Sequence, residues 1–118
     1  MSKPLALIIE DDYDLATIFE AALQAADFET EVIRAGDAAL KHLETVTPDV
    51  VVLDLHLPQV IGTDILDHIR AEPRLAETRV MVTTSDARLA ETVQDQADLV
   101  LIKPISFSQL RDMAMRLR

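Results

Sequence analysis

The sequence of 118 residues contains no cysteine and no tryptophan, and only four of its residues are aromatic. The absence of cysteine rules out disulfide bonds and thiolate metal sites, and it fits a reducing compartment. We therefore expect a cytoplasmic protein. With so few aromatic side chains, a buried core has to consist mainly of Val, Ile, Leu, Ala and Met, which is typical of α/β packing. A chain of this length is expected to form one domain over residues 1–118.

The sequence also lacks a long apolar segment and an excess of positive charge. No apolar run approaches the length that crosses a bilayer. The N-terminal segment MSKPLALII meets three acids rather than a cleavage site, so it does not read as a secretory signal. Eleven Lys and Arg residues stand against 21 Asp and Glu residues, which gives a formal net charge of −10. A surface of this charge repels nucleic-acid phosphates and anionic lipids, so we expect no direct nucleic-acid contact and no membrane association.

Short apolar runs alternate with segments in which apolar residues recur at helical spacing. The expected strands are 5–9, 30–33, 50–54, 79–84 and 99–102, and the expected helices are 14–26, 36–46, 63–72, 87–94 and a last helix that begins at Ser106. Asp37 is expected to cap the second helix, and the spacing from Ser106 to Gln109 fits a capping box. Strict alternation favours a doubly wound α/β fold with a five-stranded parallel sheet and helices on both faces. The continuously apolar strands agree, because both faces of such a sheet are covered.

Polar residues follow or end four of the expected strands. They are Glu10, Asp11 and Asp12 after the first strand, Asp54 at the third, Thr83, Thr84 and Ser85 at the fourth, and Lys103 with Pro104 after the fifth. In a doubly wound sheet, ligands bind beyond the carboxyl ends of the strands. Crowded carboxylates stay ionised only when a cation neutralises them. A hard divalent ion such as Mg²⁺ does so with oxygen ligands and keeps positions open for water or phosphate.

Each of these residues alone has a simpler interpretation. An acid after a strand is usually a turn or cap residue, and a lysine before proline is usually an exposed turn. A flavin module of the same topology would have a loop rich in Ser, Thr and Gly after the first strand, where this chain has acids. An aspartyl phosphatase would have a second catalytic acid at position 56, which is His. It is the convergence of four strand ends that favours a site.

Five segments, in this order and spacing, resemble the receiver domains of two-component response regulators. They are IIEDD, VVVLDLHLP, the glycine at 62, the hydroxyl pair at 83 and 84, and IKP. The resemblance covers nearly the whole chain and implies a flavodoxin-like (CheY-like) fold with strand order 2-1-3-4-5. It implies Mg²⁺-dependent phosphoryl transfer from a phosphohistidine of a sensor histidine kinase or phosphotransfer protein. A downstream protein or an attached output domain would read the resulting surface change, and the resemblance leaves room for a homodimer.

Carried over residue by residue, the resemblance makes Asp54 the phospho-acceptor. Glu10 and Asp11 look like the acid pair that holds Mg²⁺, Asp11 directly and Glu10 through water. Asp54 and the backbone carbonyl of His56 would complete the protein's share of the metal site. Asp12 lies one place beyond the pair and is expected to cap the first helix.

The same resemblance assigns the remaining site residues. Lys103 would contact the phosphoryl group, and the Lys103–Pro104 peptide bond would be cis. Thr84 is the expected switch hydroxyl, because an ungapped count from Asp54 reaches it. Thr83, one residue away and on the other face, is the alternative.

Two features depart from the family's pattern. The position three residues before Lys103 often carries Tyr or Phe in the family, and here it is Val100, which has no comparable rotamer exchange. The segment from Thr84 to Lys103 is shorter than usual, which predicts a truncated fourth helix. A degenerate receiver that binds partners without phosphorylation is therefore the alternative function. Otherwise we expect a signalling domain that assists its own phosphorylation and dephosphorylation, with His56 and Asp86 placed to tune the phosphate lifetime, rather than an enzyme.

Overall fold

The computed structural model describes residues 2–58 and 60–118. The strands are β1 (Leu5–Ile9), β2 (Glu29–Ile33), β3 (Val50–Asp54), β4 (Arg79–Thr84) and β5 (Leu99–Ile102). The helices are α1 (Tyr13–Ala25), α2 (Gly36–His42), α3 (Gly62–Ala71), α4 (Ala87–Val93) and α5 (Phe107–Arg116), with a short 3₁₀ helix, η1 (Pro73–Leu75), before β4. All strands pair in parallel in the order β2-β1-β3-β4-β5, which confirms the predicted order.

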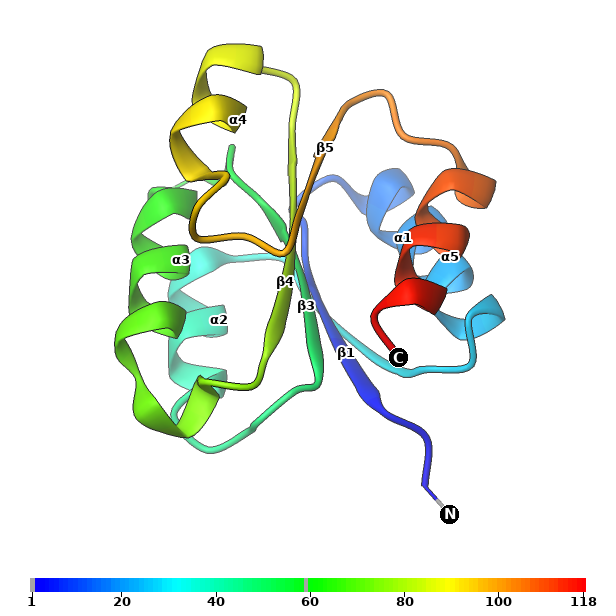
Figure 1. The fold of residues 1–118 in the computed structure, drawn as a ribbon, viewed down its shortest axis with the longest axis horizontal. Coiled ribbons are helices and arrows are strands. Elements are labelled where there is room, and N and C mark those ends of the chain that lie inside the picture. Colours follow the sequence, from blue (N-terminus) through cyan, green and yellow to red (C-terminus); the bar gives the residue numbers. More distant parts are fainter. Residues whose placement is uncertain (1, 59) are drawn as a thin grey trace.

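The sheet lies between two helical layers, with α1 and α5 on one face and α2, α3 and α4 on the other (Figure 1). Successive residues of a strand point to opposite faces, so each strand contributes to both layers. Val50 and Val52 pack with the α1 and α5 layer, whereas Val51 and Leu53 pack with the other. Because both faces are covered, β3 is buried along its whole length.

Of the three helix caps predicted from the sequence, two are present and one is not. Asp12 accepts a hydrogen bond from the Leu15 N–H at 3.0 Å, and Ser106 accepts one from the Gln109 N–H at 3.0 Å. The prediction that Asp37 caps α2 is wrong, because α2 begins at Gly36 and its N-cap, Ala35, makes no side-chain bond.

α2 starts at Gly36, as predicted, and this glycine lies close to the segment before α3. An added Cβ there would lie 2.7 Å from the Cβ of Val60, so only glycine allows the close approach between α2 and the segment before α3. Asp37 consequently lies in the first turn, where its carboxylate accepts a hydrogen bond from the Ala38 N–H. The helix ends earlier than residue 46, at His42.

The loop that follows the short α4 is joined to α3 by Arg70. Its guanidinium donates to the backbone oxygen of Thr78 at 3.0 Å, to the backbone oxygen of Gln96 and to the Asp98 carboxylate at 3.0 Å. Asp98 also accepts a hydrogen bond from the Val80 N–H at 2.8 Å. The loop between α4 and β5 is therefore fixed to β4 and α3, although α4 has only seven residues.

None of the helices in the described part of the chain combines the length and apolar character that crossing a bilayer requires.

The hydroxyl of Thr83 lies inside the sheet with no hydrogen-bond partner among the described residues. An unsatisfied buried hydroxyl destabilises the folded state by about 1–3 kcal/mol. We therefore expect Thr83→Val, which keeps the shape of the side chain, to raise the free energy of unfolding by about 1 kcal/mol in urea denaturation. Thr84→Val is the matched control and should lower it, because the Thr84 hydroxyl is hydrogen-bonded. A loss of stability in Thr83→Val would contradict this account.

Candidate functional site

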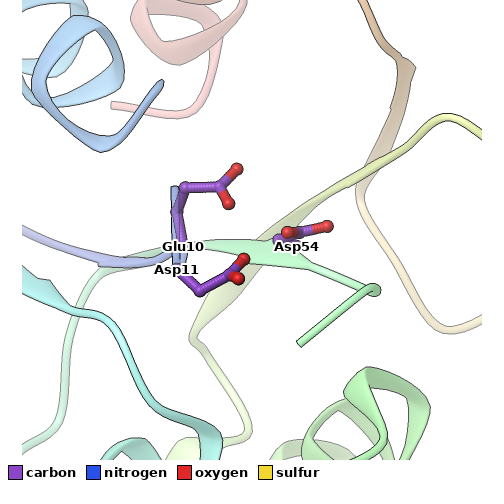
Figure 2. A group of neighbouring side chains, drawn as sticks. All are labelled: Glu10, Asp11 and Asp54. Carbon is purple, nitrogen blue, oxygen red and sulfur yellow. The ribbon is translucent and has the colours of Figure 1, made fainter. Parts of the chain in front are cut away.

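Three carboxylates gather at the carboxyl end of the sheet. Figure 2 shows Glu10 and Asp11 just after β1 beside Asp54 at the end of β3, and one oxygen of each lies within 4.8 Å of the others. Glu10 is 1% exposed and Asp54 is 2% exposed, whereas Asp11 is half-buried. The structure thus brings together all three acids that the sequence predicted for a metal site.

Strand pairing is what places these acids side by side. β1 and β3 are neighbours, and Ile9 lies opposite Leu53, so the residues that follow, Glu10 and Asp54, meet at the same edge. Asp54 is also paired with Thr83 on the other side, and its Oδ1 accepts a hydrogen bond from the His56 N–H at 3.0 Å. The Asp54 carboxylate is therefore held on a rigid, buried strand.

Lys103 brings a positive charge to the same place from β5. Its Nζ lies 3.0 Å from Glu10 Oε1 and 3.4 Å from Asp54 Oδ2, with the side chain 19% exposed. The Lys103 N–H donates to the Thr84 backbone oxygen at 2.8 Å, and the Lys103–Pro104 bond is cis, as the resemblance implied. One ammonium thus faces the three clustered carboxylates.

This imbalance changes the protonation of the buried groups. Burial, a hydrogen bond with Asp54 and the negative charge of Asp54 raise the pKa of Glu10 from its ordinary 4.5 to about 7, although the bond from Lys103 opposes the rise. Burial by itself lowers the pKa of Lys103, but the hydrogen bond to Glu10 and the charges of both acids outweigh burial and raise it. The two shifts therefore differ in their main cause, which is burial for Glu10 and the neighbouring acids for Lys103.

Thr84 lies beside the acids but is directed to a different partner. Its Oγ1 accepts a hydrogen bond from the Asp86 N–H at 3.0 Å and lies 2.7 Å from the Nε2 of His56. Alternation along β4 places Thr84 on the face of Val82, and Thr83 on the opposite face with Met81. Thr84 rather than Thr83 thus has a polar contact that phosphorylation chemistry could alter, and its role as switch hydroxyl stays a prediction.

Two contacts of the site were not predicted from the sequence. His56 was expected to offer its backbone carbonyl to the metal and to tune the phosphate lifetime, but the contact of its imidazole with Thr84 was not predicted. Arg34, at the end of β2, donates through Nη2 and Nε to the backbone oxygen of Asp11, at 3.2 and 3.4 Å, and its guanidinium lies 5.1 Å from the centre of the Tyr13 ring. Strand order brings Arg34 near Asp11, because β2 and β1 are paired, but no local motif marks it.

The acid cluster has the chemistry of a divalent-cation site. Mg²⁺ prefers oxygen ligands and keeps several waters, so it is bound through few carboxylates. Glu10, Asp11 and Asp54 offer such oxygens at one edge of the sheet. The residues present therefore fit Mg²⁺, and the His56 carbonyl as a further ligand stays a prediction.

Comparison with known proteins agrees with the fold. The family model for the response regulator receiver domain matches residues 6–115. The sensory transduction protein RegX3 of Mycobacterium tuberculosis is 36% identical over 106 residues, which are 88% of this chain and 46% of that protein. The phosphate regulon transcriptional regulatory protein PhoB of Rhizobium meliloti is 29% identical over 110 residues, which are 91% of this chain and 48% of that protein.

Solved structures show the same arrangement. The response regulator receiver domain (CheY-like) from Methylobacillus flagellatus superposes with a TM-score of 0.88 at 26% identity, over 99% of this chain and 100% of that one. The chemotaxis response regulator CheY4 of Vibrio cholerae superposes with a TM-score of 0.86 at 20% identity, over 99% and 100% of the two chains.

This chain belongs to the response regulator receiver domain family, whose members act in two-component signalling. Receivers of this family bind Mg²⁺ through acidic residues and interact with histidine kinases and output domains. The chain spans less than half the length of the curated relatives compared with it, between 19% and 48%.

The raised pKa of Glu10 makes stability depend on pH. Between pH 4.5 and about 7 the native Glu10 keeps a proton that the unfolded chain has released. Stability therefore falls as pH rises through this window, by about 2–3 kcal/mol. The raised pKa of Lys103 adds stability that is lost only above its ordinary 10.5, so it does not act in the same window.

Urea denaturation of the metal-free protein at several pH values between 5 and 7.5 measures this effect, with Glu10→Gln as the comparison. The variant cannot titrate, so its unfolding free energy should fall less across this range than that of the wild type. Equal pH slopes for the two proteins would show that Glu10 does not hold a proton in the native state.

Proposed function

We propose that this chain is a phospho-accepting receiver, in which Asp54 takes a phosphoryl group from a phosphohistidine of a sensor histidine kinase or a phosphotransfer protein. The observation that carries the proposal is the position of Asp54, buried at a strand end with the Lys103 Nζ 3.4 Å from its Oδ2 and two further acids within 4.8 Å. A carboxylate so placed is rigid, partly neutralised and beside a cation site. Those are the requirements of phosphoryl transfer, in which catalysis consists mostly of positioning and charge stabilisation.

In the proposed transfer, an oxygen of Asp54 attacks phosphorus in line with the bond to the donor nitrogen. The new O–P bond forms as the N–P bond breaks, and the electron pair of that bond leaves with the imidazole, which takes up a proton. Oδ1 is held by the His56 N–H, and Oδ2 faces Lys103, so the carboxylate cannot rotate freely. The Lys103 ammonium then neutralises part of the charge on the phosphoryl oxygens.

Glu10, Asp11, Asp54 and the His56 carbonyl would hold Mg²⁺, which supplies the remaining neutralisation of phosphoryl charge. Arg34 keeps the backbone of Asp11 in place through its carbonyl oxygen. Thr84 would bond the phosphoryl group once it is attached. The domain would assist its own phosphorylation and its dephosphorylation by water, rather than act as an enzyme on a separate substrate.

The biological setting belongs to the same proposal. Receiver function would place this chain in the cytoplasm, with a sensor histidine kinase or phosphotransfer protein as one partner. A downstream protein or an attached output domain would read the altered surface. Net charge of −10 opposes direct nucleic-acid binding by this domain. A homodimer of receivers is a further candidate for the phosphorylated form.

One observation favours a second function, that of a degenerate receiver that binds partners without phosphorylation. Val100 is packed in the α2, α3 and α4 layer, where it has no polar atom and no large rotamer change to couple to Thr84. This alternative would keep the fold and the acid cluster but not the acceptor chemistry.

Phosphorylation by a small donor distinguishes the two functions. Incubation with Mg²⁺ and acetyl phosphate, followed by intact-mass measurement, should show a single phosphate adduct that is lost when Mg²⁺ is chelated beforehand. Asp54→Asn should form no adduct. Asp12→Asn is the matched control, because Asp12 is an exposed acid next to Asp11 and asparagine also caps helices. This variant should be phosphorylated like the wild type.

The absence of an adduct, or an adduct that survives Asp54→Asn, would contradict the phospho-acceptor function of Asp54. The degenerate receiver would then be the remaining function of the two.

A further inference from the structure

The hydroxyl of Thr84 has a limited number of hydrogen bonds to offer. A threonine hydroxyl carries one proton to donate and two lone pairs that accept. In this structure the Asp86 N–H, at 3.0 Å, uses one lone pair. The other polar contact of the hydroxyl among the described residues is with Nε2 of His56, at 2.7 Å, which is a short hydrogen bond.

Burial decides which way the bond between Thr84 and His56 runs. Thr84 is 0% exposed, so water does not reach its side chain. Among the described residues the Asp86 N–H can only donate, which leaves Nε2 of His56 as the acceptor for the hydroxyl proton. A buried hydroxyl proton without an acceptor is costly. The hydroxyl therefore donates to Nε2, and a neutral His56 carries its own proton on Nδ1.

Phosphorylation of Asp54 would change this arrangement, and the inference that follows rests on the proposed phospho-acceptor function. A phosphoryl group presents only acceptor oxygens to its surroundings. If Thr84 bonds one of them, its single proton is no longer available to His56. The lone pair that is freed can then accept a bond from a protonated Nε2.

We propose that phosphorylation of Asp54 reverses the hydrogen bond between Thr84 and His56, so that His56 is a positioning residue that competes with the phosphoryl group for the Thr84 proton. The proton on Nδ1 leaves to water and another from water binds Nε2, so the ring stays neutral and no net proton is taken up. Exchange with water is open to the ring because His56 is exposed. In the phosphorylated state the hydroxyl would have all three of its hydrogen bonds.

This reversal gives the switch a route that does not need an aromatic residue at position 100. His56 lies in the segment between β3 and α3, and its backbone N–H is bonded to Asp54. The same residue thus contacts the acceptor through its backbone and the switch hydroxyl through its ring. Val100 has no polar atom with which to do this. The surface expected to respond is therefore the β3–α3 segment and the start of α4 at Asp86.

Nitrogen NMR of the histidine rings tests the reversal directly. The ¹⁵N-labelled chain is examined at about pH 8, above the usual range of imidazole titration, before and after loading with Mg²⁺ and beryllofluoride. Nε2 of His56 should move from the pyridine-type to the pyrrole-type position and Nδ1 in the opposite direction. The rings of His42 and His68 in the same spectra are internal controls and should not exchange their tautomers.

The two failures are distinguishable. A chain that binds no beryllofluoride would overturn the phospho-acceptor function, and this inference with it. A loaded chain whose His56 nitrogens keep their positions would overturn this inference alone.

Variants of His56 test the competition. His56→Leu removes one hydrogen bond from Thr84 in both states. In the unloaded state the loss leaves the buried hydroxyl proton without an acceptor, whereas in the loaded state it leaves only a lone pair unused, which costs less. Beryllofluoride should therefore bind about 2- to 10-fold more tightly to the variant. His56→Gln places an amide, which can accept or donate, at a similar reach and should move the affinity back toward the wild-type value.

The gain in beryllofluoride affinity should disappear in the double variant His56→Leu with Thr84→Val, compared with Thr84→Val alone, because both of these proteins lack the hydroxyl. A merely structural effect of the leucine would persist in the double variant and would not be rescued by glutamine. Binding by His56→Leu that is equal to or weaker than that of the wild type would contradict the proposal.

Discussion

The ion pairs that Lys103 makes with Glu10 and Asp54 are the interactions on which the rest of the site depends. The two acids are almost fully buried, and a buried charge is tolerated only when it is paired and hydrogen-bonded. Lys103 satisfies part of that demand from a position 93 residues away from Glu10 in the sequence, so it also connects β5 to β1 across the sheet. One ammonium cannot balance three carboxylates, and burial together with the neighbouring Asp54 raises the pKa of Glu10.

The surroundings of this cluster combine a rigid part with a part that is free to change. The loop after α4 is held to α3 and β4 by Arg70 and Asp98. The other end of α4 begins at Asp86, whose N–H is bonded to the Thr84 hydroxyl. A change at Thr84 therefore reaches the start of α4 and the exposed His56 ring, while the far end of α4 stays anchored. This geometry suits a switch with a small range of movement.

Much of the fold could be predicted from the sequence, because it depends on local patterns. Apolar runs identify the strands, and Asp12 and Ser106 mark helix starts through bonds to residues three positions on. The strand order followed from family resemblance rather than from any pattern. The cluster of Glu10, Asp11 and Asp54 was predictable since parallel strands end at one edge, and Lys103 was expected beside it. The cap of α2 was predicted wrongly, because the N-cap is Ala35 and not Asp37. The close approach of Gly36 to Val60, 24 positions away, has no signal in the local sequence. Likewise the hydrogen bond between Thr84 and His56 depends on a rotamer and on the pairing of β3 with β4, which no local motif encodes.

The central claim is that the excess negative charge at the strand ends forms a Mg²⁺ site, and calorimetric titration with Mg²⁺ tests it most directly. Measured in buffers of different ionisation enthalpy, binding at about pH 6 should release close to one proton per chain, because Glu10 must give up its proton. The release should vanish at about pH 9, where Glu10 is already ionised. Asp11→Asn should weaken binding by about tenfold or more, whereas Asp12→Asn should not. Binding without proton release at the lower pH, or binding unaffected by Asp11→Asn, would contradict the account.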